Sequence, residues 1–156
     1  PGTCRHLTQS QREDLLADGK AFALRLDMHK ACQYAGSLHW TDRAHGKQQA
    51  RPEIFGDIVL ARKDTPTSYH ISVTVDDDLQ DISLVTRGED LFQASHIHRL
   101  LQALLNLNVP QYHHHALLRG KDGKRFAKRD KSLTIRSLRN KAHSPQQVWN
   151  MLENFR

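Results

Sequence analysis

The chain has 156 residues, the length of one ordinary domain, and begins at Pro1 without an initiator Met. Hydrophobic residues make up 38% and charged residues 26%, and no apolar run approaches the roughly 18 residues that a membrane span needs. This composition excludes collagen-like, low-complexity and membrane-spanning classes. Two cysteines are too few for a disulfide scaffold, so a cytoplasmic location is expected. The missing Met suggests a processed piece of something longer.

Positive charge is concentrated in the last third of the chain. The net charge is +6, but Arg119–His143 alone holds ten Lys or Arg against two Asp. Upstream, Asp76–Asp90 holds six acidic residues and one Arg. A phosphate-rich ligand would be attracted to the basic region. Charge counting alone favours a solvated, mixed-sign surface equally well.

The first half of the chain contains few clear elements. Apolar spacing predicts a helix over Thr8–Ala17 and a strand over Ala21–Met28. Tyr34–Pro52 is polar and punctuated by Gly and Pro, so a loop is expected there. Asp57–Ala61 is a short apolar strand candidate.

The second half has an alternating α/β pattern. Ile82–Thr86 is β-branched and apolar, which suits a buried parallel strand. Ser95–Leu107 has apolar residues at helical spacing, with Ser95 as its cap, and the short apolar run Ala116–Leu118 follows. Two final helices are expected at Leu133–Lys141 and Ser144–Asn154, the second capped by Ser144 with Pro145 in its first turn. This order predicts an α/β fold with ligands at the carboxyl ends of the strands.

Histidines and cysteines do not form a closed metal set in the sequence. In a strand, only His113 and His115 of the His113–His115 run could share a ligand, and no nearby Cys or carboxylate completes a zinc site. The interpretation is a polar strand with one His facing a cleft. Cys4 and Cys32 form no CxxC pair, and Cys32 is expected to be a small buried residue.

Two features could bind a charged substrate. Gly123–Arg129 places four cations within six residues, on a turn that could fold over a triphosphate. Arg87 closes the buried strand candidate at its carboxyl end, and an Arg there can bind a carboxylate through two hydrogen bonds. The Tyr69 hydroxyl can add a directional hydrogen bond, so this pair suits an acidic amino acid.

An ordered series of motifs resembles the second half of the catalytic domain of class I glutamyl-tRNA synthetases, over roughly residues 1–140. The motifs are Asp57–Arg62, Pro66–His70, Val75–Asp77, Thr86–Asp90 and Gly123–Arg129. The resemblance implies a Rossmann-type fold in two parts. Residues 1–55 would be the remainder of the inserted zinc-binding subdomain. Residues 56–156 would be the second half of the catalytic domain, with a KMSKS-like loop and terminal helices.

The resemblance also implies roles for individual residues. Tyr69 and Arg87 match residues that hold the substrate glutamate. The KMSKS-like motif consists of Arg125, Phe126, Ala127, Lys128 and Arg129. Lys128 matches the ATP-contacting lysine and is the implied catalytic residue, with Arg125 and Arg129 helping to bind the phosphates. Arg125 keeps the charge of the signature's first lysine, whereas Ala127 loses its serine hydroxyl. Magnesium would travel with ATP. Asp76, Asp77 and Asp78 could be metal ligands, but helix or turn capping is the favoured interpretation for at least two of them.

Within this family, the chain resembles the glutamyl-Q tRNA(Asp) synthetases, short paralogues without the anticodon-binding domain. Only 27 residues follow Arg129, and Pro1–Arg5 resembles the last ligand stretch of the paralogues' zinc-binding insertion, where Cys4 would match one zinc ligand. The implied reaction joins L-glutamate and ATP into glutamyl-adenylate and passes glutamate to queuosine in tRNA(Asp). No HIGH-like sequence is present, so the isolated chain is expected to be inactive. A truncated glutamyl-tRNA synthetase charging tRNA(Glu) and a non-catalytic basic RNA-binding module remain alternatives.

Overall fold

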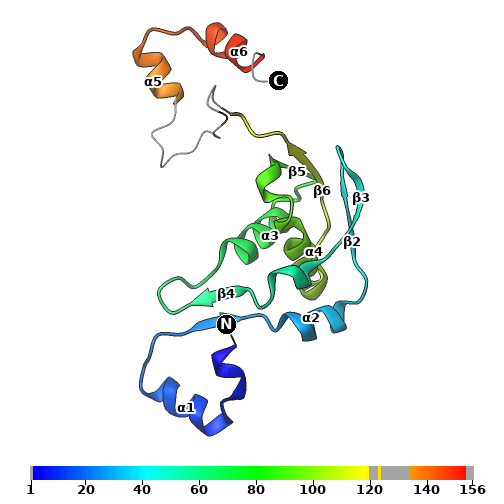
Figure 1. Cartoon of the computed structure of the whole chain (residues 1–156), viewed down its shortest axis with the longest axis vertical. Coiled ribbons are helices and arrows are strands. Elements are labelled where there is room, and N and C mark those ends of the chain that lie inside the picture. Colours follow the sequence, from blue (N-terminus) through cyan, green and yellow to red (C-terminus); the bar gives the residue numbers. More distant parts are fainter. Residues whose placement is uncertain (1, 120–122, 124–133, 154–156) are drawn as a thin grey trace. The chain divides into compact units, whose positions relative to one another are not determined.

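The computed structural model describes residues 2–119, 123 and 134–153 of the chain (Figure 1). Two compact units are present, Pro1–His115 and Ala116–Arg156. The first unit contains the strands β1–β6 and the helices α1–α4, whereas the second contains the helices α5 and α6. Within the described residues, no helix is long and apolar enough to cross a membrane.

The N-terminal region of the first unit is small and largely exposed. A 3-10 turn, η1 (Thr3–His6), precedes α1 (Gln9–Ala17), which Thr8 caps through a reciprocal capping box with Gln11. The predicted first helix is therefore confirmed. The predicted strand over Ala21–Met28 is wrong in extent, because β1 covers only Ala23–Arg25 and its residues are exposed. It ends early because the Asp27 carboxylate accepts from the backbone N–H of Lys30 and so starts a new helix, α2 (Met28–Ala35).

A two-stranded sheet joins this region to the middle of the chain. β1 pairs antiparallel with β4 (Val59–Arg62), which confirms a strand near the predicted Asp57–Ala61. Another 3-10 turn, η2 (Pro52–Phe55), lies just before β4 in the sequence.

The expected loop over Tyr34–Pro52 is wrong, because it contains a β-hairpin. β2 (His39–Asp42) pairs antiparallel with β3 (Gly46–Gln49). Burial alternates along β2, so Trp40 and Asp42 point inward while the neighbouring polar side chains face solvent. Strand pairing and one inward face therefore stabilise a segment whose composition is mostly polar.

The main sheet has four strands in the order β3-β2-β6-β5. β5 (Leu84–Gly88) and β6 (Gln111–His115) are parallel, in a register that sets Arg87 opposite His114, and β2 is parallel to β6. The predicted parallel strand is confirmed, two residues further along the chain than expected. Its connection to β6 runs through η3 (Glu89–Leu91) and α4 (Ala94–Leu105), so it is a βαβ unit.

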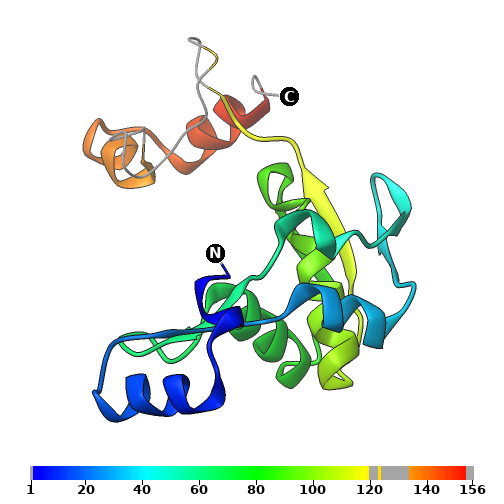
Figure 2. The same ribbon diagram turned by 60° about the horizontal axis from the view of Figure 1, so that its bottom comes forward.

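Helix α4 lies at the centre of the first unit. It lies beside α3 (Tyr69–Leu79) and also contacts α2 and β2 (Figures 1 and 2). One stripe of α4, formed by Ile97, Leu100 and Leu101, builds the apolar core with α2 and Ile58. A second stripe, formed by Ser95, His98 and Gln102, is buried but polar. Its side chains bond to Arg87 and Tyr112, so this stripe faces the sheet.

The second unit contains α5 (Ile135–Asn140) and α6 (Pro145–Glu153). Both predicted terminal helices are confirmed. Ser144 Oγ accepts from the backbone N–H of Gln147 at 3.3 Å, while the Gln147 side chain accepts from the backbone N–H of Ser144 at 2.8 Å. This capping box, with Pro145 as the first helical residue, fixes the start of α6 as the sequence indicates.

Candidate active site

The centre of the candidate site is Arg87, near the carboxyl end of β5. Its side chain is directed into the molecule, with only 9% of the residue exposed. The Nε–H donates to His114 Nε2 at 3.1 Å, and Nη1 donates to His98 Nδ1 at 3.1 Å. Nη2 donates to Ser95 Oγ. The guanidinium is therefore held by three neutral groups from β6 and α4.

These contacts fix the proton positions on His114. Because His114 Nε2 accepts from Arg87, its Nδ1 must carry the proton, and Nδ1 lies 2.6 Å from Asp42 Oδ2. Asp42 is fully buried and also accepts from the backbone N–H of His114 at 3.2 Å. Its other oxygen accepts from the β2–β3 turn, including the half-exposed His45 ring at 2.8 Å. A continuous arm of hydrogen bonds thus runs from His45 through Asp42 and His114 to Arg87.

A second arm leads from Arg87 toward α3. His98 Nδ1 accepts from Arg87, so the proton is on Nε2, which lies 3.1 Å from His70 Nδ1. Tyr69, the first residue of α3, lies against both rings, with centroid distances of 5.6 Å to His70 and 5.9 Å to His98. The structure therefore brings Tyr69 and Arg87 into one cluster, with His98 between them.

The cluster keeps its histidines neutral. Burial lowers the pKa of His98 to about 3, with the charge of Arg87 as the next cause. Burial also lowers the pKa of His70 and that of His114, although the Asp42 carboxylate opposes the shift at His114. For Asp42, burial raises the pKa, but hydrogen bonds from His114, from His45 and from the turn backbone outweigh it and hold the pKa well below the usual range.

Arg87 has no acidic partner in direct contact within residues 2–119, 123 and 134–153. None of the ion pairs found there includes its guanidinium. The negative charge of Asp42 reaches Arg87 through the His114 ring, and Asp77 on α3 interacts with Arg87 electrostatically without an ion pair. A buried cation is costly unless an anion compensates it. The guanidinium has five N–H groups and uses three in the contacts above, which leaves two for an anionic ligand.

Aromatic rings support the cluster from the sheet side. The Arg87 guanidinium carbon lies 5.1 Å from the centroid of the buried Tyr112 ring, a cation–π contact. Trp40 contacts Tyr112 edge-on at 5.3 Å and lies 5.0 Å from Phe92. The arginine is therefore packed as well as hydrogen-bonded, so its side chain has few alternative conformations.

The predicted phosphate-binding residues Arg125, Lys128 and Arg129 lie outside the described residues, as do Phe126 and Ala127 of the same KMSKS-like motif. The short apolar run at Ala116–Leu118 is described and forms no strand; the strand before it is β6, which carries the histidine run.

The candidate metal ligands are not gathered into a site. In the part of the chain that the structure describes, no group of three or more His, Cys, Asp or Glu side chains could hold a metal ion. Cys4 is exposed and Cys32 is only partly buried. The described residues around Cys4 therefore do not form a zinc site by themselves.

The histidine run and the acidic run have different structural roles. His114 points into the cluster, whereas its neighbours His113 and His115 are not buried. The prediction of a polar strand is thus confirmed, but the prediction that one His faces a cleft is wrong, because the inward-facing His114 is buried between Asp42 and Arg87. Asp76–Asp78 lie in the last turn of α3, where Asp78 accepts from the backbone N–H of Asn108 at 2.8 Å.

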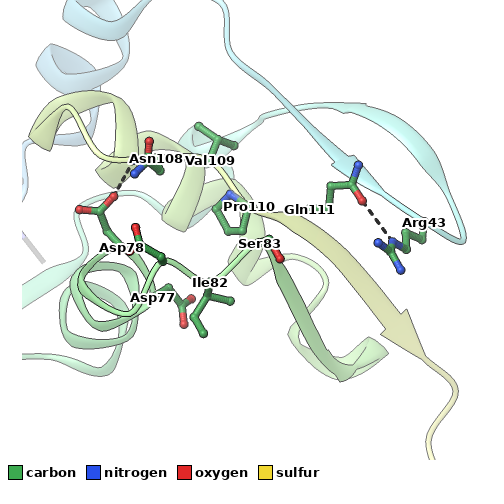
Figure 3. A pocket seen from close by; sticks show the side chains of 10 residues that line it. Arg43, Asp77, Asp78, Ile82, Ser83, Asn108, Val109, Pro110 and Gln111 are labelled. Atoms are coloured by element: carbon green, nitrogen blue, oxygen red, sulfur yellow. Dashed lines mark hydrogen bonds between the residues drawn. The ribbon is translucent and has the colours of Figure 1, made fainter.

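A hollow lies at the amino ends of the parallel strands, the opposite end of the sheet from Arg87. Its volume is about 470 Å³, and its lining includes Ser83 and Gln111, which lie at or just before the amino ends of β5 and β6. Figure 3 shows Asp78 bonded to Asn108 and Arg43 bonded to Gln111 at its margins. Ligands of open α/β sheets bind at the carboxyl ends of the strands, so the Arg87 cluster is the better candidate.

Comparison with known proteins identifies the family. The family model for class I tRNA synthetases (E and Q), catalytic domain, matches residues 1–155. The chain therefore belongs to this family, and its fold is that of a class I synthetase catalytic domain with a mixed sheet.

Individual relatives agree with this assignment. The glutamyl-Q tRNA(Asp) synthetase of Rhodobacter capsulatus is 43% identical over 97% of this chain and 55% of its own length. That of Nocardia farcinica is 36% identical over 97% of this chain and 46% of its own length. Glutamate–tRNA ligase 2 of Syntrophus aciditrophicus is 31% identical over 97% of this chain and 30% of its own length. The chain thus spans about half the length of the first two relatives.

Among solved structures, the chain is similar to a glutamate tRNA ligase from Elizabethkingia meningosepticum in complex with its amino acid. The TM-score is 0.62 at 26% identity, over 80% of this chain and 24% of that one.

Sequence reasoning missed most of the residues that surround Arg87. His98 was not identified because it lies in a segment whose apolar spacing predicts a helix, and Asp42 was not identified because a loop was expected there. Ser95 was expected to cap α4, but it lies inside the helix and its hydroxyl accepts from Arg87 instead. The usable signal was the polar series Ser95, His98 and Gln102, which repeats at helical spacing beside the apolar stripe.

Proposed function

We propose that this chain carries the glutamate-binding part of an ATP-dependent ligase that forms glutamyl-adenylate. The observation that carries the proposal is the buried Arg87, whose direct partners in the described part of the chain are all neutral. Such a cation has two N–H groups left for an anion, and a carboxylate accepts two parallel N–H bonds from one guanidinium. Glutamate supplies carboxylates of this kind.

Tyr69 supports the same assignment. It is half exposed at the start of α3 and lies against His98, which binds Arg87. A hydroxyl at this position can add one directional hydrogen bond to a ligand held by Arg87. We assign Tyr69 and Arg87 to glutamate, as the sequence predicts.

The phosphates of ATP are assigned to the basic loop. Lys128, with Arg125 and Arg129, would stabilise the charge that develops as pyrophosphate leaves. Glutamate attacks the α-phosphorus through a carboxylate oxygen, the bond to the β-phosphate breaks, and pyrophosphate departs with its electron pair. Magnesium would accompany ATP and would supply charge that screens its phosphates. The protein's part is positioning and electrostatic stabilisation rather than covalent catalysis.

The proposed acceptor is queuosine in tRNA(Asp). An acceptor hydroxyl would attack the adenylate carbonyl, AMP would leave, and the hydroxyl proton would be lost to solvent. The names of the Rhodobacter and Nocardia relatives support this acceptor. The alternative acceptor, tRNA(Glu), is supported by similarity to glutamate–tRNA ligases. Transfer of radiolabelled glutamate by the full-length gene product to tRNA(Asp) with and without queuosine, and to tRNA(Glu), separates the two.

The test of glutamate binding is glutamate-dependent ATP–pyrophosphate exchange by the full-length gene product. Arg87→Ala should raise the KM for glutamate far more than the KM for ATP, because only glutamate loses a partner. Lys128→Ala should mainly slow exchange. Equal effects of Arg87→Ala on both substrates would refute the assigned role, and unchanged exchange in Lys128→Ala would refute the loop assignment.

A further inference from the structure

We propose that His98 and His114 are positioning residues, which orient the Arg87 guanidinium toward the substrate carboxylate by accepting two of its N–H bonds. The inference rests on the proposed function of Arg87 in binding glutamate. It adds that the orientation of Arg87 is set by two histidines from different elements, each anchored through its second ring nitrogen.

Each histidine is suited to this role by its second hydrogen bond. His114 is anchored on Asp42 at 2.6 Å, and His98 on His70 at 3.1 Å. Each ring therefore has a fixed proton on the far side and a lone pair directed at Arg87. The His114 contact uses the Nε–H of Arg87, while the His98 contact uses Nη1. Two acceptors on different nitrogens fix the rotation of the guanidinium plane.

The two histidine rings accept from Arg87 through different ring nitrogens. His114 accepts from Arg87 at Nε2, whereas His98 accepts at Nδ1. In side-chain length, a Gln amide reaches the position of Nε2 and an Asn amide reaches that of Nδ1. His114→Gln and His98→Asn can therefore keep an acceptor for Arg87. By contrast, His114→Asn can keep only the hydrogen bond to Asp42, and His98→Gln can keep only the hydrogen bond to His70. Both lose the acceptor for Arg87.

Neutral rings are required for the proposed role, because a doubly protonated histidine has no lone pair to accept with. The lowered pKa of His98 and that of His114, for which burial is the largest cause, agree with this requirement. Arg87 then remains the positive centre toward which an anion is drawn.

The test is a crossed substitution series in the full-length gene product, read by the KM for glutamate in pyrophosphate exchange. Losing one hydrogen bond to a charged group should raise this KM by about ten- to a hundredfold in His114→Asn and in His98→Gln. In His114→Gln and His98→Asn the KM for glutamate should stay within about threefold of the wild-type value, because no hydrogen bond to Arg87 is lost. The KM for ATP should stay the same in all four variants.

The order of the four variants in the KM for glutamate separates a positioning role from a role in stability. A purely structural role would rank the four variants by their urea unfolding midpoints, which are measured in parallel. If Asn and Gln had the same effect at both positions, or if the KM for glutamate followed the midpoints, the inference would be overturned. Should a buried-site variant fail to fold, the half-buried His70→Ala replaces it. Its loss of the His98 anchor should raise the KM for glutamate and leave that for ATP unchanged, and no rise would overturn the inference.

Arg87→Ala distinguishes failure of the proposed glutamate-binding role of Arg87 from failure of the positioning role of His98 and His114. If it leaves the KM for glutamate unchanged, the proposed function of Arg87 fails. If it raises that KM but the crossed series is flat, only the positioning role of the histidines fails.

Discussion

Acid should destabilise the folded chain, with a large contribution from His98. Its pKa falls from 6.5 to about 3 on folding, mainly through burial. A histidine with a lowered pKa stabilises the fold fully above pH 6.5, and this contribution is lost as the pH falls toward 3. At pH 5 the unfolded ring is mostly protonated and the folded ring is not. At about 1.4 kcal/mol per pH unit, the loss between pH 8 and pH 5 is about 2 kcal/mol.

The assay is urea unfolding at pH 8, 6.5 and 5, followed by the fluorescence of the buried Trp40. The exposed Trp149 is replaced by Phe so that it does not contribute. The ordinary aspartate pKa of 3.8 lies below this window, but burial raises the pKa of Asp77. Protonation of Asp77 would therefore oppose the loss of stability as the pH falls, and it is common to the wild type and the control.

The control is His98→Asn, which keeps an acceptor for Arg87 but cannot titrate. It should reduce the pH dependence of the unfolding free energy by about 2 kcal/mol over the same window. The remaining dependence belongs to the other histidines with a lowered pKa, including His70 and His114. An equal pH dependence in wild type and His98→Asn, or greater stability at pH 5 than at pH 8, would refute the reasoning.

Three further predictions concern stability. Leu100→Ala, in the fully buried core, should cost about 2–5 kcal/mol in urea unfolding, while the exposed Leu79→Ala should stay within about 0.5 kcal/mol; similar values would contradict the assigned core. Asp42→Asn should cost about 2 kcal/mol or more by the same assay, because it disrupts the acceptor of the buried His114 N–H; an unchanged midpoint would mean that this bond does not matter. Asp57→Ala, which loses bonds from Arg5 and from the first residue of α2, should cost about 1–2 kcal/mol in thermal unfolding, and unaltered melting would contradict it.

Local signals in the sequence were enough for elements with strong caps or strong periodicity. Thr8 and Ser144 cap α1 and α6 through side-chain to backbone hydrogen bonds, and both residue types are typical of helix N-caps. The apolar spacing of α4 likewise predicts a helix. The hairpin of β2 and β3 could not be predicted in this way, because its pairing depends on a turn and on the burial of Trp40 and Asp42 against distant segments.

The sequence singles out the central residue of the candidate site but not the residues around it. Arg87 stands out because it follows a strand candidate in an α/β pattern, where ligands are expected to bind. His98 and Asp42 contact this region only in the folded chain, since they lie 11 and 45 positions from Arg87 in the sequence. A single sequence contains no direct record of such tertiary contacts. The polar stripe on α4 was visible, but its meaning depended on knowing that the helix covers the sheet.

The most direct test of the account is a crystal structure of the full-length gene product with bound glutamate. The account predicts a glutamate carboxylate oxygen within about 3.2 Å of an Arg87 guanidinium nitrogen, with His98 and His114 still accepting from the same side chain. A glutamate bound elsewhere, with Arg87 contacting only its neutral protein partners, would contradict the account.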